Sequence, residues 1–407
     1  MRSDFWKFWT GETISSFGSS ITQFALPLLV FKLTGSAVSL GIAFAMFGLP
    51  HLFFGLLIGA WSDRLDRKRL MIVVDVVSAA VVASVPLASA AGVLSVWWIF
   101  AGGFALATLG IFFQAAQFAA IPSLVERDQL VTANGRIQAS FSAATVVGPL
   151  AAGGVLAFVP IESLLYIDAL TFVVSAAALA LIARPFNAPR ETVRTSIRAD
   201  VVEGLRYVLR HPVLRNISAM MALINLVSVT VYAQMVLFAK QRFAVSDSEL
   251  GLLFAADGAG VVVMSLAAGP LRGRFSFGNV ALGALMLSGV LTIALAYAPT
   301  YLLAVVVSAL SSGLGILFNI NTGSLRQAIV PNHLLGRIIT IAMVLGFSAS
   351  PIGATIGGFI VERTGDVQTV YASIGALVFG IALYFRLFSP LGHAERYLEA
   401  PAEAVAG

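Results

Sequence analysis

Twelve long apolar stretches, separated by short polar segments, run through this chain of 407 residues. Hydrophobic residues make up 58% of it, charged residues only 11%, and the mean hydropathy is +0.92. A soluble protein cannot cover its surface with so few polar side chains. The composition therefore excludes a soluble enzyme, a disordered chain and, despite a pI near 9.7, a nucleic-acid-binding protein. The absence of cysteine excludes a secreted disulfide scaffold.

Each apolar stretch has the length of one membrane crossing, because a bilayer core about 30 Å thick needs about 20 residues of helix. The stretches are continuous rather than alternating, so they predict helices rather than the strands of a membrane barrel. The predicted spans are 10–31, 37–60, 70–91, 96–118, 135–158, 163–183, 214–239, 249–270, 279–298, 301–324, 337–361 and 367–388. We therefore expect an all-α membrane protein with twelve transmembrane helices.

The basic residues test this count of spans. When the loops are assigned to alternate sides of a membrane, 21 of the 25 Lys and Arg residues fall on one side. Cytoplasmic loops carry such an excess of positive charge, and one missed span would scramble the alternation. The split predicts an even number of spans with both termini in the cytoplasm. The expected location is the plasma membrane, which is the inner membrane of a bacterium.

The two halves of the chain align with each other. Leu40 matches Leu250 at an offset of 210, and Ile121 matches Val330 at an offset of 209. Six spans followed by six spans in the same orientation form a parallel repeat, which places a substrate site between the halves near the bilayer midplane. The expected domains are an N-terminal six-helix bundle (1–184), a cytoplasmic linker (185–212), a C-terminal six-helix bundle (213–388) and a cytoplasmic tail (389–407).

The linker contains a segment, 197–209, with apolar residues at helical spacing and arginines elsewhere around the turn. This pattern predicts a cationic amphipathic helix on the inner leaflet or, as the alternative, a solvated linker helix.

The loop after the second span reads GAWSDRLDRKR over residues 59–69. It resembles the signature loop of the major facilitator superfamily, although Asp66 stands where many members have glycine. The resemblance implies the fold of that superfamily and a cytoplasmic gate made by Gly59, Asp63, Arg64 and Arg67, with Asp75 as a further partner. The alternative is that these arginines only fix the topology.

Further motifs resemble the branch of the superfamily that holds macrolide-efflux and enterobactin-exporter-like proteins. These are ALPLLVFKLTG at 25–35, GLRYVLRHP at 204–212 and GPLAAGG at 148–154 in the fifth span. Small residues allow close helix contacts and proline interrupts the hydrogen-bond ladder of a helix. The predicted helix-bending residues are Gly148, Pro149, Gly153, Pro351 and Gly357. The alternative is ordinary packing of small residues.

In the superfamily fold, spans 1, 4, 7 and 10 line the central cavity, and each of these spans carries a polar stripe here. Polar side chains facing lipid would be unfavourable, so we expect the stripes to face inward. The predicted cavity residues are Ser16, Ser19, Gln23, Gln114, Gln117, Asn225, Ser228, Tyr232, Ser311 and Asn319. Such a cavity, mostly uncharged, suits an amphipathic or lipophilic compound. The alternative for each residue is a hydrogen bond between helices without a ligand.

Ionisable residues within the spans are few, and two are candidates for proton coupling. Asp257 lies inside the eighth span, and Glu12 lies in the first span nearer the inner surface. Burial disfavours the charged form of a carboxyl group, so either side chain could take up and release a proton. Asp168 in the sixth span is interpreted as structural, and His51 as a packing residue. No metal cluster, catalytic triad or phosphate loop is recognisable in the sequence.

These features predict a secondary transporter that works by alternating access and exports a small amphipathic compound, such as a drug, macrolide or siderophore, in exchange for protons. It would need no cofactor beyond the proton gradient, and it would be a monomer whose partners are membrane lipid and a small-molecule substrate. An alternative is a carrier of lysophospholipid or another lipid, or an importer. A non-transporting membrane sensor or assembly protein is an alternative of another class, and an enzyme is not expected.

Overall fold

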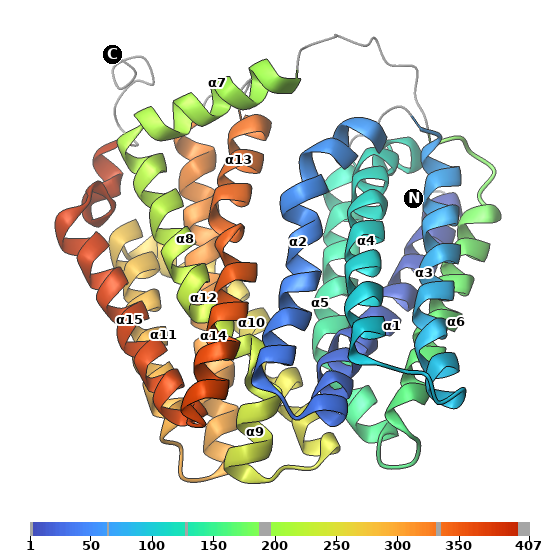
Figure 1. The fold of residues 1–407 in the computed structure, drawn as a ribbon. Coiled ribbons are helices and arrows are strands. Elements are labelled where there is room, and N and C mark those ends of the chain that lie inside the picture. Colours follow the sequence, from blue (N-terminus) through green and yellow to red (C-terminus); the bar gives the residue numbers. More distant parts are fainter. Residues whose placement is uncertain (1–2, 63–64, 127–128, 187–196, 331–334, 398–407) are drawn as a thin grey trace. The chain divides into compact units, whose positions relative to one another are not determined.

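The computed structural model describes residues 3–62, 65–126, 129–186, 197–330 and 335–397. Within these ranges every element of regular structure is helical (Figure 1). The chain divides into two compact units, 1–191 with 239–255 and 192–238 with 256–407. Helix α10 is therefore shared between the units. The expected domain boundaries remain a prediction.

The first unit is built from six long helices. They are α1 (Ser3–Thr34), α2 (Ala37–Ser62), α3 (Arg67–Ala90), α4 (Val96–Leu124), α5 (Leu130–Val155) and α6 (Ile161–Ala180). Helix α1 packs on α5 and α6, α3 packs on α4 and α6, and α2 packs on α4. Buried Phe5, Phe8, Met71 and Phe186 form part of an apolar cluster at one end of this unit.

The second unit contains the remaining helices. They are α7 (Ile197–Arg210), α8 (Pro212–Ala233), α9 (Met235–Phe243, divided between the units), the second part of α10 (Asp247–Arg274), a π-helical turn (Gly278–Leu282), α11 (Gly283–Ala296), α12 (Tyr301–Ile329), α13 (Leu335–Phe347), α14 (Ala349–Thr364), α15 (Val367–Phe388) and a 3-10 segment (Pro390–Tyr397). Helix α11 packs on α12 and α15, and α8 packs on α13, α14 and α15. Figure 1 shows α7 lying across the end of α8 and α13 rather than along them.

Eleven helical segments in the described residues are long and apolar enough to cross a membrane. The remaining predicted span, 135–158, corresponds to α5, which is 26 residues long but carries Gly, Ser and Thr residues that make it less apolar. The all-helical fold expected from the sequence is confirmed. The segment expected to be amphipathic is helix α7, and its membrane contact stays a prediction.

Two predicted spans are interrupted. The seventh, 214–239, breaks at Gln234, so that α8 and α9 replace a single helix. The eleventh, 337–361, breaks at Ser348, between α13 and α14. The second break has a direct cause, because Pro351 has no N–H to donate to the carbonyl of Phe347 one turn earlier.

Candidate functional site

A polar cavity of about 220 Å³ lies within the second unit, between α8, α10, α11, α12 and α15. Its wall mixes apolar side chains with one carboxylate and several hydroxyls and amides. The polar lining residues are Asn225, Ser228, Tyr232, Asp257, Ser288, Thr292, Ser308, Ser311, Ser312 and Asn319. A cavity with an apolar body and a few convergent polar groups is the ordinary form of a small-molecule site.

Asp257 supplies the carboxylate of this cavity. Its side chain is 7% exposed, and Ser308 Oγ donates a hydrogen bond of 2.6 Å to Oδ1. Ser312, one turn further along α12, also hydrogen-bonds the carboxylate. The two serines lie four residues apart, so a single face of α12 supplies both donors. The acid is therefore hydrogen-bonded to the helix that carries much of the lining.

Helix α11 adds a hydroxyl network that the sequence analysis missed. Ser288 and Ser311 place their Oγ atoms 2.9 Å apart, and Thr292 Oγ1 lies 3.4 Å from Ser311 Oγ. Span 9 was not among the four spans expected to line the cavity. The spacing of four residues between Ser288 and Thr292 in an otherwise apolar helix was the available signal.

The polar stripe predicted on the seventh span faces the same cavity. Asn225 Nδ2 donates to the carbonyl of Gly346 at 2.9 Å, which ties α8 to α13. Ser228 and Tyr232 follow at three and four residues, and all three line the cavity. The structure thus brings together Asn225, Ser228, Tyr232, Ser311, Asn319 and Asp257. Their role in binding a substrate stays a prediction.

The candidates on α1 and α4 belong to the first unit and do not line this cavity. Ser16 and Ser19 are half-buried, while Gln23 and Gln114 are exposed. Gln117 is half-buried and its side chain is a neighbour of Glu12, although its Nε2 has no hydrogen-bond partner among the described residues.

Glu12 also lies within electrostatic range of Asp75 on α3. Asp75 is 1% exposed and hydrogen-bonds Ser175 on α6. Its Oδ2 has no hydrogen-bond partner in the part of the chain that the structure describes. These residues form a buried acidic cluster inside the first unit.

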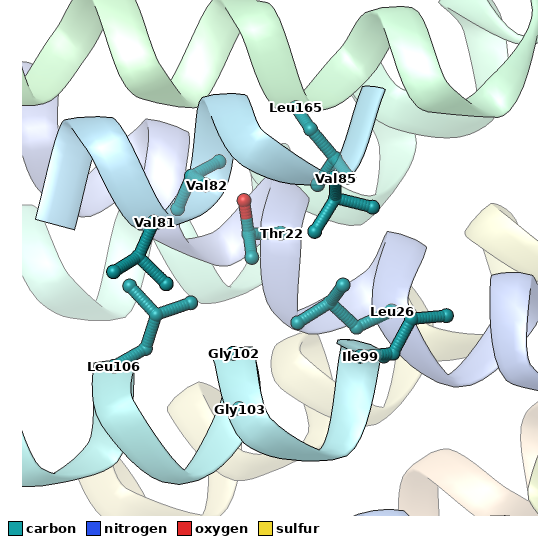
Figure 2. A pocket seen from close by; sticks show the side chains of 10 residues that line it. All are labelled: Thr22, Leu26, Val81, Val82, Val85, Ile99, Gly102, Gly103, Leu106 and Leu165. Atoms are coloured by element: carbon teal, nitrogen blue, oxygen red, sulfur yellow. The ribbon is translucent and has the colours of Figure 1, made fainter. Parts of the chain in front are cut away.

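A second, much smaller void of about 10 Å³ lies in the first unit. Figure 2 shows it enclosed by valine, leucine and isoleucine side chains, with the hydroxyl of Thr22 as its polar atom. Thr22 donates a hydrogen bond to Asp168, which Thr171 also contacts. The void has no room for a substrate, and Asp168 ties α6 to α1, as expected of a structural residue.

The predicted gate is described only in part. Asp63 and Arg64 lie outside the described residues, and Gly59 lies in α2. Arg67 is 8% exposed and donates to the carbonyl of Phe186 at 3.2 Å. Its role as a gate stays a prediction.

Beside Arg67, Lys68 Nζ lies 2.5 Å from the carbonyl oxygen of Ile182, just beyond the end of α6. Asp66 accepts the N–H of Arg69 at 2.9 Å and so caps α3. The basic end of α3 is therefore attached to the end of α6, a contact favoured by the negative end of a helix dipole.

Three of the predicted helix-bending residues lie where two helices approach each other closely. A side chain at Gly153 would meet the backbone of Ser248 and Gly251 on α10, within the first unit. Gly148 faces Ser20 on α1, and Gly357 faces Thr230 on α8. Pro149 lies inside the continuous helix α5, whereas Pro351 follows the break after α13. No group of three or more potential metal ligands occurs among the described residues.

Helices long and apolar enough to cross a membrane, packed around a polar cavity with a carboxylate, are typical of an integral membrane transporter. The family described as transmembrane secretion effectors matches residues 1–403, and the chain belongs to this family of the major facilitator superfamily. It is 30% identical to the multidrug efflux pump Tap of Mycolicibacterium fortuitum, over 90% of this chain and 92% of that protein. It is 25% identical to macrolide efflux protein A of Streptococcus pyogenes, over 93% of this chain and 94% of that protein.

Solved structures share the fold at low sequence identity. The nucleoside transporter NupG superposes with a TM-score of 0.79 at 14% identity, over 94% of this chain and 98% of that structure. A bacterial homologue of the iron transporter ferroportin superposes with a TM-score of 0.72 at 15% identity, over 98% of this chain and 99% of that structure. Both neighbours are transporters, and at these identities the likeness shows the fold alone.

Proposed function

We propose that this chain exports small amphipathic compounds across the bacterial inner membrane in exchange for protons, with both termini in the cytoplasm. The observation that carries the proposal is Asp257, a membrane-embedded carboxylate in the wall of the polar cavity. Ionisable groups inside membrane spans are costly and mark substrate or proton pathways. The names of the relatives, a multidrug pump and a macrolide efflux protein, support export of such compounds.

Export against a gradient requires a group whose protonation differs between the two states of the carrier. Asp257 can be this proton-binding group, because the cavity offers its carboxylate to a bound compound together with hydroxyl groups and apolar surface. A proton and a polar group of the compound would then compete for one site. The transporter needs no cofactor for this exchange, and it works as a monomer. Arg67 and Asp75 belong to the proposed cytoplasmic gate.

The test is export by the purified protein in proteoliposomes. Vesicles are loaded in turn with a macrolide, a cationic dye and a siderophore, and efflux is followed with a proton gradient, without one, and with a protonophore. We expect efflux of at least one of these compounds to require the gradient and to stop with the protonophore. Flux that is the same with and without the proton gradient would contradict proton coupling. The absence of flux for every compound would contradict the transport of small amphipathic compounds.

A further inference from the structure

Arg326, in the last turn of α12, is a buried arginine that has no anionic partner among the described residues. It is 5% exposed, and its Nη2 lies 3.0 Å from the sulfur of Met221 on α8. Its Nε meets no hydrogen-bond acceptor in the part of the chain that the structure describes. Within the described ranges no carboxylate is paired with this guanidinium. Burying an unpaired charge is strongly unfavourable, so the residue needs an explanation.

A role in membrane topology does not explain the burial. Arginines at the ends of spans set orientation while their charged groups reach the interface. Arg215 in the first turn of α8 and Arg274 at the end of α10 are exposed in this way. Arg326 differs from both because the protein encloses its side chain. It therefore loses most of its hydration without contributing more to topology than an exposed arginine would.

The guanidinium lies against the wall of the polar cavity. Met221, which it contacts, is a lining residue of the cavity, and so is Asn319 on α12. Residues 319, 322 and 326 of one helix share a face. Asp257 cannot neutralise the arginine, because its partner Ser308 lies 18 residues earlier on α12. At 1.5 Å per residue this is about 27 Å along the helix axis.

The internal repeat shows that the fold itself does not require this charge. The offset of 209 that aligns Ile121 with Val330 also aligns Gln117 with Arg326 and Glu12 with Met221. In the first unit the neutral amide of Gln117 is a close neighbour of the acid Glu12. In the second unit the acid is replaced by a thioether and the amide by a guanidinium. The repeat therefore leaves one cation in the second unit with the place of its acidic partner filled by methionine.

From this we infer that Arg326 binds an anionic group of the transported compound, so that the cavity selects amphipathic compounds carrying a single carboxylate, sulfonate or phosphate. This inference rests on the proposed export function and assigns its substrate class. A guanidinium offers several donors in a planar fork that matches such groups. One arginine suits a monoanion, because a dianion would call for a second cation and the cavity wall already carries the acid Asp257.

The test compares two compounds that differ by one charged group, anilinonaphthalene sulfonate and the uncharged N-phenylnaphthylamine. Their binding to the full-length protein in detergent is measured by titration calorimetry, with protein-free detergent as the blank. Two variants are compared with the wild type. Arg326→Gln introduces the residue type found at the equivalent position of the first unit, and Arg326→Lys keeps the charge. Arg215→Gln, at an exposed site on α8, is the matched control.

We expect Arg326→Gln to weaken binding of the sulfonate at least about tenfold, the usual scale for losing a hydrogen bond to a charged group. Arg326→Lys should retain an intermediate affinity, and Arg215→Gln should match the wild type. Binding of N-phenylnaphthylamine should be unchanged in all variants, which also shows that they are folded. Equal affinity of wild type and Arg326→Gln for the sulfonate would overturn the inference, as would wild-type protein that binds only the uncharged compound.

An anionic lipid headgroup could bind Arg326 in the same way as an anionic substrate. Measurements in nanodiscs of defined lipid composition distinguish lipid binding from substrate binding. If phosphatidylglycerol stabilises the wild type but not Arg326→Gln against heat, and the sulfonate does not compete with it, the assignment to substrate is overturned. The proposed function fails by a different result, the loss of gradient-driven efflux for every compound. Efflux of uncharged compounds that survives in Arg326→Gln would leave that function intact.

Discussion

The hydroxyl of Ser308 on α12 donates a 2.6 Å hydrogen bond to Oδ1 of Asp257 on α10, at the wall of the polar cavity. The serine is 2% exposed and the acid 7% exposed, so both are removed from bulk solvent. A charged carboxylate accepts such a bond more strongly than a protonated one does. A proton on Asp257 would therefore alter the contact between two helices as well as the charge of the cavity.

The first prediction concerns the charge of Asp257. Asp257→Asn keeps the size of the side chain and its capacity to accept from Ser308, but it cannot lose a proton. We expect export driven by a pH gradient in proteoliposomes to fall at least about a hundredfold, the scale of losing an essential proton-transfer group. Substrate binding in detergent should persist, because the cavity keeps its shape.

Two serines on α12 supply the controls for this experiment. Ser308→Ala removes a donor to Asp257 and should change the pH at which export is half-maximal while leaving measurable flux. Ser324→Ala, at an exposed position of the same helix, should behave like the wild type. If Asp257→Asn exports at the wild-type rate under a pH gradient, Asp257 has no part in coupling.

The polar faces were predictable from the sequence where helical spacing was regular. Asn225, Ser228 and Tyr232 repeat at three and four residues, and an α-helix places such residues on one face. Ser288 and Thr292 were missed because the family resemblance assigned the cavity to four other spans. The break at Gln234 was not predictable from an apolar stretch that continues through it.

Arg326 shows a different limit of sequence reasoning. In a count of basic residues it is one more charge at the end of a span, like the exposed Arg274. Its burial depends on how α8 and α12 pack, which brings the sulfur of Met221 to 3.0 Å from its guanidinium. Contacts between residues this far apart in sequence are set by tertiary packing, and composition and spacing contain no signal for them.

The second prediction concerns the contact between α5 and α10 in the first unit. A Cβ atom at Gly153 would lie 2.9 Å from the carbonyl oxygen of Ser248 and 3.2 Å from the Cα of Gly251. Both neighbours are backbone atoms, so the helices would have to separate. We expect Gly153→Ala to lower the stability by about 1–3 kcal/mol, the usual cost of overpacking, measured by thermal unfolding in detergent.

Gly154→Ala is the matched control on the adjacent position of the same helix. Nothing lies within 4 Å of the Cβ that it would add, and alanine is the better helix former. We expect this variant to be as stable as the wild type or slightly more so. Equal stability of the two alanine variants would show that the close approach of α5 and α10 at Gly153 does not contribute to the thermal stability.

The third prediction concerns Asp247, the first residue of α10, which lies between two lysines of the first unit. Its carboxylate oxygens lie 2.5 Å from Lys32 Nζ and 2.6 Å from Lys240 Nζ. Asp247→Asn would leave the two cations without their shared anion. We expect a loss of about 1 kcal/mol at low salt, the scale of a partly exposed ion pair, measured as thermal stability.

High salt should reduce this loss, because mobile ions screen charges that remain partly exposed. Glu249→Gln is the control on the same helix, since Glu249 accepts its hydrogen bonds from the nearby Ser246. Its effect should be smaller than that of Asp247→Asn. A loss in Asp247→Asn that stays the same at all salt concentrations would contradict an electrostatic origin.

The fourth prediction concerns His211, which begins α8 at the junction with α7. Its Nδ1 accepts the N–H of Leu214 at 3.4 Å, and its ring stacks on Tyr207 with the centroids 6.2 Å apart. Burial lowers the pKa of His211 below its ordinary value, because it disfavours the imidazolium. Protonation of Nδ1 would also abolish its capacity to accept the Leu214 bond.

Since burial lowers the pKa of His211 in the folded protein, the unfolded chain binds the proton first as the pH falls. The stabilising contribution is complete above the ordinary histidine pKa of about 6.5 and is lost as the pH drops below it toward the lower pKa of the folded state. We expect His211→Asn, which keeps a capping side chain, to lose less thermal stability than the wild type between about pH 7.5 and about pH 5. His393→Gln, at an exposed histidine of the same unit, should follow the wild-type curve. Parallel curves for wild type and His211→Asn would show that protonation of this histidine does not destabilise the junction.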